Sequence, residues 1–149
     1  MCIRDSYCPE VDWTRIARAV ESVSIPVCGN GGINAHEDLE RMRRETGCKL
    51  VMVGQAALYD PWIFGGREVS SDEAARFLVE YADLMIADGA APRGAAARVK
   101  QLLRAWRAGG LIRDEEHRMS MLRETDGARL LERLRDYSLR TASSSSATP

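Results

Sequence analysis

The stretch Ile25-Pro-Val-Cys-Gly-Asn-Gly-Gly-Ile33 constrains the fold of this chain more than any other. A short apolar run ends there in Gly-Asn-Gly-Gly, and a segment with helical spacing follows directly. A second apolar run, Leu50-Val-Met-Val53, ends at Gly54. Parallel strands that end in glycine turns present backbone N–H groups, which bind anions. The two turns together predict one phosphate-binding site.

The composition is that of a globular protein. Hydrophobic residues make up 45% of the 149 residues and charged residues 29%, as in one folded domain or the end of a larger protein. No apolar run reaches the ~18 residues of a membrane-spanning helix, and no signal peptide is visible. The sequence therefore predicts a cytoplasmic protein with no membrane partner.

The cysteines favour reduced thiols. Their spacing contains no C-x-x-C pair; they are Cys2, Cys8, Cys28 and Cys48. We therefore expect no metal site. Cys28 and Cys48 lie in or beside predicted strands, and we interpret both as core thiols.

The first predicted helix follows Asp12, which is placed to cap it, and ends near Glu21. Its apolar side consists of Trp13, Ile16, Ala17 and Val20. The next run, Ile25–Cys28, has no polar alternation, which is typical of a parallel strand covered on both faces.

The second helix and strand repeat this order. Asn34 is placed to cap the helix, with Glu37 three residues on as in a capping box, and Gly47 is placed to end it. Leu50–Val53 forms the second strand. Helices that alternate with buried strands predict an α/β fold with parallel strands.

After Gly65 the sequence becomes wholly helical. Four segments between residues 71 and 140 carry apolar residues at helical spacing, and Asp126 is placed to cap the last. The predicted inward residues are Phe77 or Leu78, Tyr81, Leu84, Met85, Val99, Leu102, Leu103, Trp106, Met119, Leu122, Leu130, Leu131, Leu134 and Tyr137. Short amphipathic helices in sequence predict a small all-α helical bundle.

Composition sets the two ends of the chain apart. Met1–Ser6 has no periodicity and resembles a translated adapter sequence, so we interpret residues 1–6 as a non-native leader. Residues 141–149 are rich in serine and predicted to be disordered. The predicted domains are therefore 7–66 and 71–140.

Charge is unevenly distributed. Residues 1–92 hold 9 Lys/Arg against 15 Asp/Glu, whereas residues 93–149 hold 12 against 7. A basic C-terminal part indicates either a polyanionic partner or a solvated helical surface.

Several of these segments together resemble the tRNA-dihydrouridine synthase family. The matching motifs are Asp12-Trp13, Ile25–Ile33, Thr46–Cys48, Val51–Leu58 and Pro61–Phe64. The resemblance implies that residues 7–66 form the C-terminal part of a (β/α)8 TIM barrel, and that residues 71–140 form a helical tRNA-binding domain. In such barrels the turns after strands seven and eight commonly build a phosphate site.

The resemblance also implies a reaction. Members of this family use FMN, reduced by NADPH, to saturate the C5–C6 bond of uridine in tRNA. Hydride passes from flavin N5 to uracil C6, and a cysteine protonates C5. The base would be flipped out of the folded RNA to reach the flavin.

The phosphate-site residues carry over by position. Asn30, Gly31 and Gly32 match the family's first phosphate-binding turn, and Gly54 and Gln55 match the second. Glycine lets backbone N–H groups approach phosphate oxygens closely. The family usually has arginine where this chain has Gln55, so a charged phosphate contact is absent here.

No catalytic residue is assigned to this chain. Cys8-Pro9 resembles the Cys-Pro of the family's active-site loop, but Tyr7–Trp13 aligns better with a non-catalytic segment. The resemblance implies that the catalytic cysteine, a base-contacting lysine and a histidine lie in preceding barrel strands. We therefore expect the chain by itself to be inactive. His36 begins the second helix and is interpreted as near the phosphate or as an ordinary surface histidine.

The candidate RNA contacts are Arg98, Lys100, Arg104 and Arg107, which would bind tRNA phosphates. Trp106 lies on an apolar stripe and is interpreted as a core residue. Two other functions stay open. One is another FMN or sugar-phosphate TIM-barrel enzyme, and the other is a non-catalytic RNA-binding module made of the helices.

Overall fold

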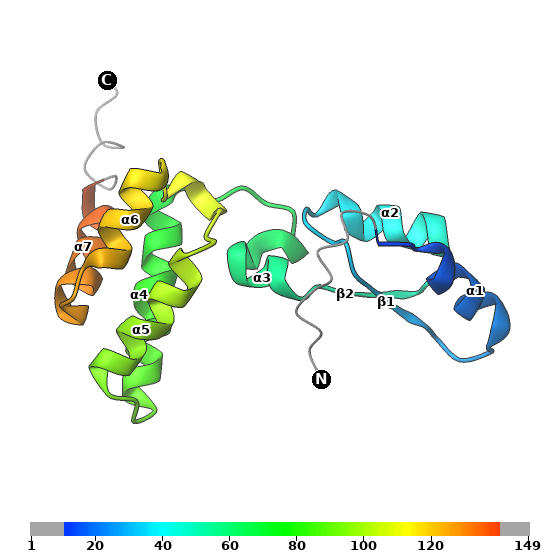
Figure 1. Ribbon diagram of the computed structural model, residues 1–149, viewed down its shortest axis with the longest axis horizontal. Coiled ribbons are helices and arrows are strands. Elements are labelled where there is room, and N and C mark those ends of the chain that lie inside the picture. Colours follow the sequence, from blue (N-terminus) through cyan, green and yellow to red (C-terminus); the bar gives the residue numbers. More distant parts are fainter. Residues whose placement is uncertain (1–10, 141–149) are drawn as a thin grey trace, which may run out of the picture. The chain divides into compact units, whose positions relative to one another are not determined.

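The computed structural model describes residues 11–140 (Figure 1). The predicted leader, Cys2, Cys8 and the serine-rich tail lie outside these residues. In chain order the elements are α1 (Thr14–Ser22), β1 (Cys28–Asn30), α2 (Glu37–Thr46), β2 (Leu50–Met52), α3 (Gln55–Tyr59), the 3₁₀ helix η1 (Pro61–Phe64), α4 (Ser71–Ala87), α5 (Pro92–Leu103), the 3₁₀ helix η2 (Ala108–Gly110), α6 (Glu115–Arg123) and α7 (Gly127–Arg140). None of the helices within these bounds is long and apolar enough to cross a membrane.

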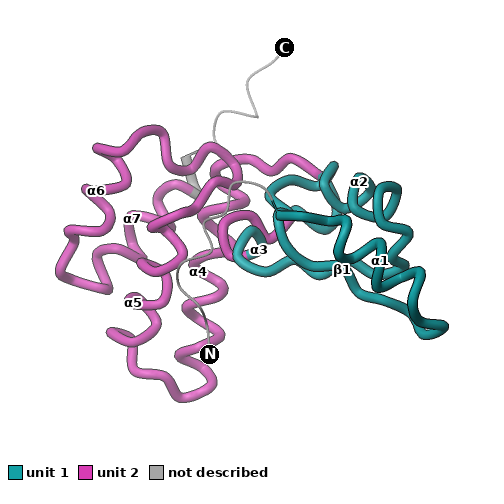
Figure 2. The backbone as a smooth tube through the Cα atoms, turned by 45° about the vertical axis from the view of Figure 1, so that its right-hand side comes forward, with its two compact units in different colours: residues 1–57, 63–66 teal, residues 58–62, 67–149 magenta. Residues whose placement is uncertain are grey.

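The chain divides into two compact units, coloured separately in Figure 2. Of the described residues, 11–57 and 63–66 belong to the first unit. Residues 58–62 and 67–140 belong to the second. Each unit has its own buried core.

The first unit contains a two-stranded parallel sheet. Cys28 pairs with Leu50 and Asn30 with Met52, and α2 connects the strands. This confirms the prediction of parallel strands in an α/β arrangement. The helix packs tightly on the sheet, because a Cβ added to Gly29 would lie 2.6 Å from the Met42 sulfur. The buried core residues are Trp13, Ile33, Leu39, Met42, Cys48, Ala56 and Ile63.

The prediction that both faces of this sheet are covered is wrong for the described residues. The strand begins at Cys28, not Ile25, and Ile25 is 71% exposed. Pairing with β2 starts only at Cys28, and Pro26 has no N–H to extend it. Only one face packs into the core, so the alternate residues are exposed; they are Cys28, Asn30, Leu50 and Met52. Cys28 is therefore not a core thiol, whereas Cys48 is buried as predicted.

The predicted cap at Asp12 lies one residue early: Trp13 occupies the N-cap position of α1 without a side-chain cap bond, while Asp12 Oδ1 accepts from the Thr14 N–H at 3.0 Å. The predicted capping box of α2 is wrong. Asp38, not Glu37, folds back, and its Oδ2 accepts from the N–H groups of Asn34 at 2.8 Å and Ala35 at 3.0 Å. The helix begins only at Glu37, so Asn34 lies too far ahead to cap it.

In the second unit α4, α5, α6 and α7 enclose a common core. The largest fully buried side chains there are Leu78, Val99, Leu103, Trp106, Leu111, Met121, Leu130 and Leu134. Helix α4 contacts both α5 and α7. Asp126 caps α7 as predicted, since its Oδ1 accepts from the Ala128 N–H at 2.9 Å.

Two inward faces differ from the prediction. Leu84 is 70% exposed, whereas Leu78, one of the two predicted alternatives, is buried together with three alanines, Ala74, Ala75 and Ala82. Small side chains at the contact let neighbouring helices approach closely. On α6 the buried residues are His117 and Met121, whereas Met119 is only partly buried.

Candidate functional site

The two predicted phosphate turns leave the sheet at the same edge. Asn30 ends β1 opposite Met52, which ends β2, so Gly31 and Gly54 follow neighbouring strand ends. Parallel pairing in this register brings their backbones to one edge of the sheet.

The first turn has a fixed shape. Gly31 has φ +109° and Gly32 has φ +71°, the left-handed region that favours glycine. Side chains hold both carbonyl groups: Trp13 Nε1 donates to the Gly31 oxygen at 3.0 Å, and Asn34 Nδ2 donates to the Gly32 oxygen at 3.3 Å. Glycine is therefore required here by the backbone itself.

The second turn is different. Gly54 does not have a positive φ, and a Cβ added to it would meet no atom within 4 Å. Neither backbone strain nor packing within the described residues explains glycine at this position. Gln55, the first residue of α3, is exposed beside it. The open space in front of Gly54 is what close approach of a ligand to the backbone would require.

His36 has a packing role. Its Nδ1 lies 2.8 Å from the carbonyl oxygen of Ile63 in η1. Gly66 has φ +61°, and a Cβ there would collide with the imidazole ring. The sequence interpretation did not foresee this contact, because it depends on how the chain returns after η1.

A basic segment covers α5 and η2. Between Asp88 and Asp114 the chain holds six basic residues and no acidic residue. Four of the basic side chains belong to exposed residues of α5 or its C-terminal turn: Arg93, Arg98, Arg104 and Arg107. The sequence interpretation did not include Arg93, although its charge and its place in this segment could have identified it.

Lys100 differs from the other candidates. Its Nζ donates to the carbonyl oxygen of Glu124, so its side chain joins α5 to the loop between α6 and α7. Arg98 donates to Gln101 Oε1 at 2.9 Å along the helix surface. The Arg107 guanidinium lies 5.5 Å over the Tyr59 ring, and its backbone N–H donates to the Tyr59 oxygen at 2.9 Å.

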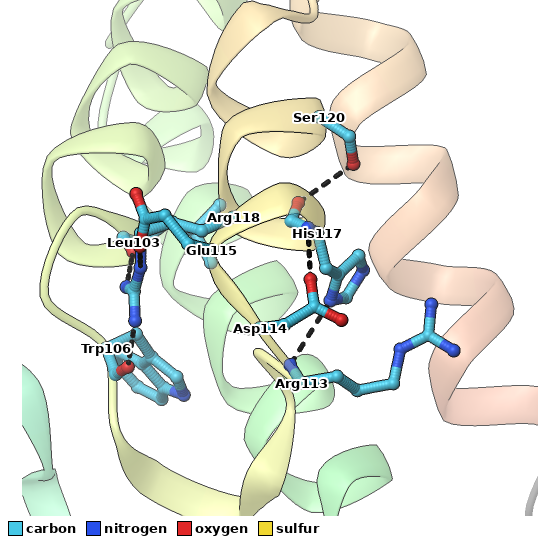
Figure 3. A network of polar contacts seen from close by, with 8 residues as sticks. All are labelled: Leu103, Trp106, Arg113, Asp114, Glu115, His117, Arg118 and Ser120. Carbon is cyan, nitrogen blue, oxygen red and sulfur yellow. Dashed lines mark hydrogen bonds and ion pairs between the residues drawn. The ribbon is translucent and has the colours of Figure 1, made fainter.

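Arg118 holds the C-terminal end of α5, as Figure 3 shows. Its Nη1 donates to the Leu103 oxygen at 2.6 Å and its Nη2 to the Trp106 oxygen at 3.5 Å, while its Nε pairs with Glu115 at 3.1 Å. Helix carbonyls at a C-terminus lack partners within the helix, and a guanidinium satisfies them. Arg118 therefore positions the turn that carries Arg104 and Arg107.

Trp106 is a core residue, as the sequence predicts. It is 1% exposed and its Nε1 donates to the Ala108 oxygen at 3.1 Å. Its ring lies 6.0 Å from Phe77 in a stacked arrangement and 6.3 Å from Trp62 edge-on. It is not available to stack on a nucleobase.

Within residues 11–140, no three or more His, Cys, Asp and Glu side chains gather where they could hold a metal ion. The candidate binding features of these residues are the glycine turns at the sheet edge in the first unit and the arginine-bearing helix in the second.

Comparison with known proteins shows which family the chain is similar to. The model of the family described as "Dihydrouridine synthase (Dus)" matches residues 3–102. A protein named "Probable tRNA-dihydrouridine synthase" from Aquifex aeolicus is 50% identical over 52 residues, which cover 35% of this chain and 16% of that protein.

Two further relatives give the same picture. The tRNA-dihydrouridine(16) synthase of Cupriavidus necator is 40% identical over 57 residues, covering 38% of this chain and 18% of its own length. The tRNA-dihydrouridine synthase B of Pseudomonas syringae pv. tomato is 33% identical over 88 residues, covering 52% of this chain and 26% of its own. The matched part thus spans about a quarter or less of these relatives. With a family match over residues 3–102, the chain belongs to the dihydrouridine synthase family.

Proposed function

We propose that this chain is part of an FMN-dependent tRNA-dihydrouridine synthase and contributes its FMN-phosphate turns and a tRNA-binding helical unit. FMN, reduced by NADPH, would supply hydride for the reduction of uridine to dihydrouridine. The names of the relatives and the family match support this reaction. Residues 7–66 would be the C-terminal part of a TIM barrel, and the catalytic cysteine would belong to a part of the barrel outside this chain.

The observation that carries the proposal is Gly54. It follows β2 at the sheet edge where Gly31 and Gly32 follow β1, yet neither strain nor packing requires glycine there. A phosphate oxygen on the open side of Gly54 would explain the missing side chain, because a Cβ would keep the backbone N–H away.

The residues of this chain would act by binding and orienting. Gly31, Gly32 and Gly54 would offer backbone N–H groups to the phosphate. Asn30 and Gln55 would add side-chain donors. Because glutamine is uncharged, the phosphate would be held by dipoles and hydrogen bonds and not by a guanidinium fork.

The test is FMN binding by the 149-residue chain, measured by flavin fluorescence, for Gly54→Ala and for the matched control Gly94→Ala. A Cβ on Gly94 also meets no atom within 4 Å, but Gly94 lies in α5. We expect Gly54→Ala to weaken FMN binding by about tenfold, the loss of one good hydrogen bond. Gly94→Ala should bind FMN unchanged. Equal binding by both variants, or no FMN binding by the parent chain, would contradict the phosphate assignment.

The exposed arginines of α5 and its C-terminal turn would contact tRNA phosphates. Gly94 and Ala97 add no bulk to the exposed side of the helix that carries Arg93, Arg98 and Arg104. Lys100 would contribute less than these arginines, because its side chain is engaged with the carbonyl oxygen of Glu124.

Gel-shift titration against tRNA at several salt concentrations tests whether these arginines contact tRNA phosphates. Replacing Arg98 and Arg104 together by glutamine should weaken binding and lower the salt slope by about one unit for each lost phosphate contact. Arg76→Gln on α4, where Arg76 pairs with Asp72, serves as a control for charge alone. A double variant with unchanged affinity and slope would show that α5 does not face the RNA.

A further inference from the structure

We propose that His117 is an acid-sensitive contact that holds the backbone of Arg113, just before α6, against the first turn of that helix. His117 is 7% exposed and lies in the first turn of α6. Figure 3 shows its ring beside Arg113 and Asp114. These residues, together with Tyr137 on α7, are called the His117 cluster below.

Both ring nitrogens of His117 have partners. The backbone N–H of Arg113 donates to Nδ1 at 3.4 Å, and Nε2 lies 2.9 Å from the hydroxyl of Tyr137. The two rings are 5.7 Å apart at 40°. Since Nδ1 accepts, the proton of the neutral ring is on Nε2 and is donated to the Tyr137 oxygen. One neutral tautomer therefore satisfies the cluster.

Protonation would break this arrangement. A second ring N–H, on Nδ1, would point at the N–H of Arg113, so that two donors face each other. The charged groups around the ring are Arg113, Arg133 and Asp114. The Asp114 carboxylate is already used, because its Oδ1 accepts from the His117 backbone N–H at 2.6 Å. The charge of Asp114 favours the imidazolium, but its effect on the pKa of His117 is smaller than the lowering by burial and by Arg113.

The electrostatic environment also disfavours the protonated form of His117. Burial, followed by the positive charge of Arg113, lowers the pKa of His117 below its ordinary 6.5, and Arg133 adds to this while Asp114 opposes it. The folded protein therefore binds fewer protons than the unfolded chain near this pH. The contribution of His117 to stability is complete above pH 6.5 and is lost as the pH falls from there toward the lowered pKa.

Other contacts hold α6 to its neighbouring helices and limit how far protonation of His117 would affect it. Toward α5, Arg118 is bound to the carbonyls of Leu103 and Trp106. Toward α7, Arg133 donates to the Ser120 oxygen at 3.3 Å and to its hydroxyl at 3.1 Å. Acid would therefore release the Arg113 backbone from the first turn of α6, while α6 stays attached to α5 and α7.

The experiment uses the 149-residue chain and its two histidines, His36 and His117. NMR of the ring nitrogens reads tautomer and pKa directly, and His117→Gln assigns the signals. Amide hydrogen exchange is then compared at pH 7.5 and pH 5, corrected for intrinsic rates. We expect residues 113–118, which include the Arg113 amide that loses its acceptor, to lose protection by about tenfold at pH 5, while α4 and α5 keep theirs.

The variants separate titration from packing. His117→Gln keeps an N–H donor but cannot titrate, so its exchange in α6 should not depend on pH. His36→Gln, the matched control, should keep the pH dependence of the parent. If His117→Gln fails to fold, His117→Asn retains an acceptor for Arg113, and the parent chain's NMR data remain decisive. A His117 pKa at or above 6.5, or equal loss of protection in α4 and α5, would overturn the proposal.

Discussion

Gly109 lies directly against the backbone of Ser70. A Cβ on Gly109 would be 2.5 Å from the Ser70 carbonyl oxygen and 2.8 Å from the Ala74 side chain, and its φ is +69°. The turn after Trp106 is therefore packed against the start of α4 through backbone atoms, which cannot move aside as a flexible side chain can.

This contact predicts that Gly109→Ala lowers the free energy of unfolding by about 2–4 kcal/mol, from left-handed strain and overlap together. Gly110→Ala separates the two causes. Gly110 has φ +59° but meets no atom within 4 Å of an added Cβ, so strain alone should cost about 1 kcal/mol. Urea unfolding followed by circular dichroism measures both, and equal losses would contradict the overlap.

Arg118→Lys should destabilise the helical unit by about 1–2 kcal/mol, although charge is retained. An ammonium group cannot reach the carbonyls of Leu103 and Trp106 while also pairing with Glu115 in the geometry of the guanidinium. The Arg118 side chain is only 20% exposed, so the carbonyls left behind are poorly hydrated. Arg123→Lys, at an exposed residue of the same helix, should change the free energy of unfolding by less than about 0.5 kcal/mol.

Trp106→Ala should lower the free energy of unfolding by about 3–5 kcal/mol, the usual cost of truncating a buried tryptophan. The near-ultraviolet circular dichroism should change as well, because Trp62 and Phe77 both contact this ring. Trp106→Phe should cost less, since it loses the hydrogen bond to Ala108 but keeps an aromatic ring. A cost below about 1 kcal/mol for the alanine variant would mean that the ring is not part of the core.

Glu73 should titrate below the ordinary value of 4.5. Its hydrogen bonds from Arg67, one of them 3.0 Å long, lower the pKa of the carboxyl group more than burial raises it. The pair therefore contributes stability above pH 4.5, which is lost as the pH falls through the lowered pKa of the folded state. Side-chain NMR titration of the parent and of Arg67→Gln checks this, because the pKa should rise toward 4.5 in the variant.

Local sequence signals predicted the elements of the fold well. Gly47 ends α2 with φ +72°, and its N–H donates to the Arg43 oxygen at 2.9 Å, as a glycine after a helix predicts. Buried stripes on α5 and α7 were also predicted correctly, with Val99, Leu103 and Leu134 fully buried. These features depend on residues close in the chain, so spacing alone contains the information.

The errors have a different origin. Ile25 and Leu84 are apolar residues predicted to be buried, yet both are exposed. Burial depends on which surface another element covers, and the sequence of one element does not contain that information. The predicted cap of α2 was wrong for a related reason. The side chain that accepts from the free N–H groups is Asp38, whereas Glu37 was expected there, and the spacing alone does not distinguish the two.

The candidate phosphate site also combines features that local sequence predicts with features that depend on tertiary contacts. The two apolar runs, the glycines that follow them and the basic character of the segment around α5 could be identified from composition and spacing. That the turns share one sheet edge, that Gly54 opens onto free space and that Lys100 binds Glu124 became apparent only in the folded chain. The physical reason is that strand register and side-chain direction arise from contacts between segments far apart in the chain, which local propensity does not specify.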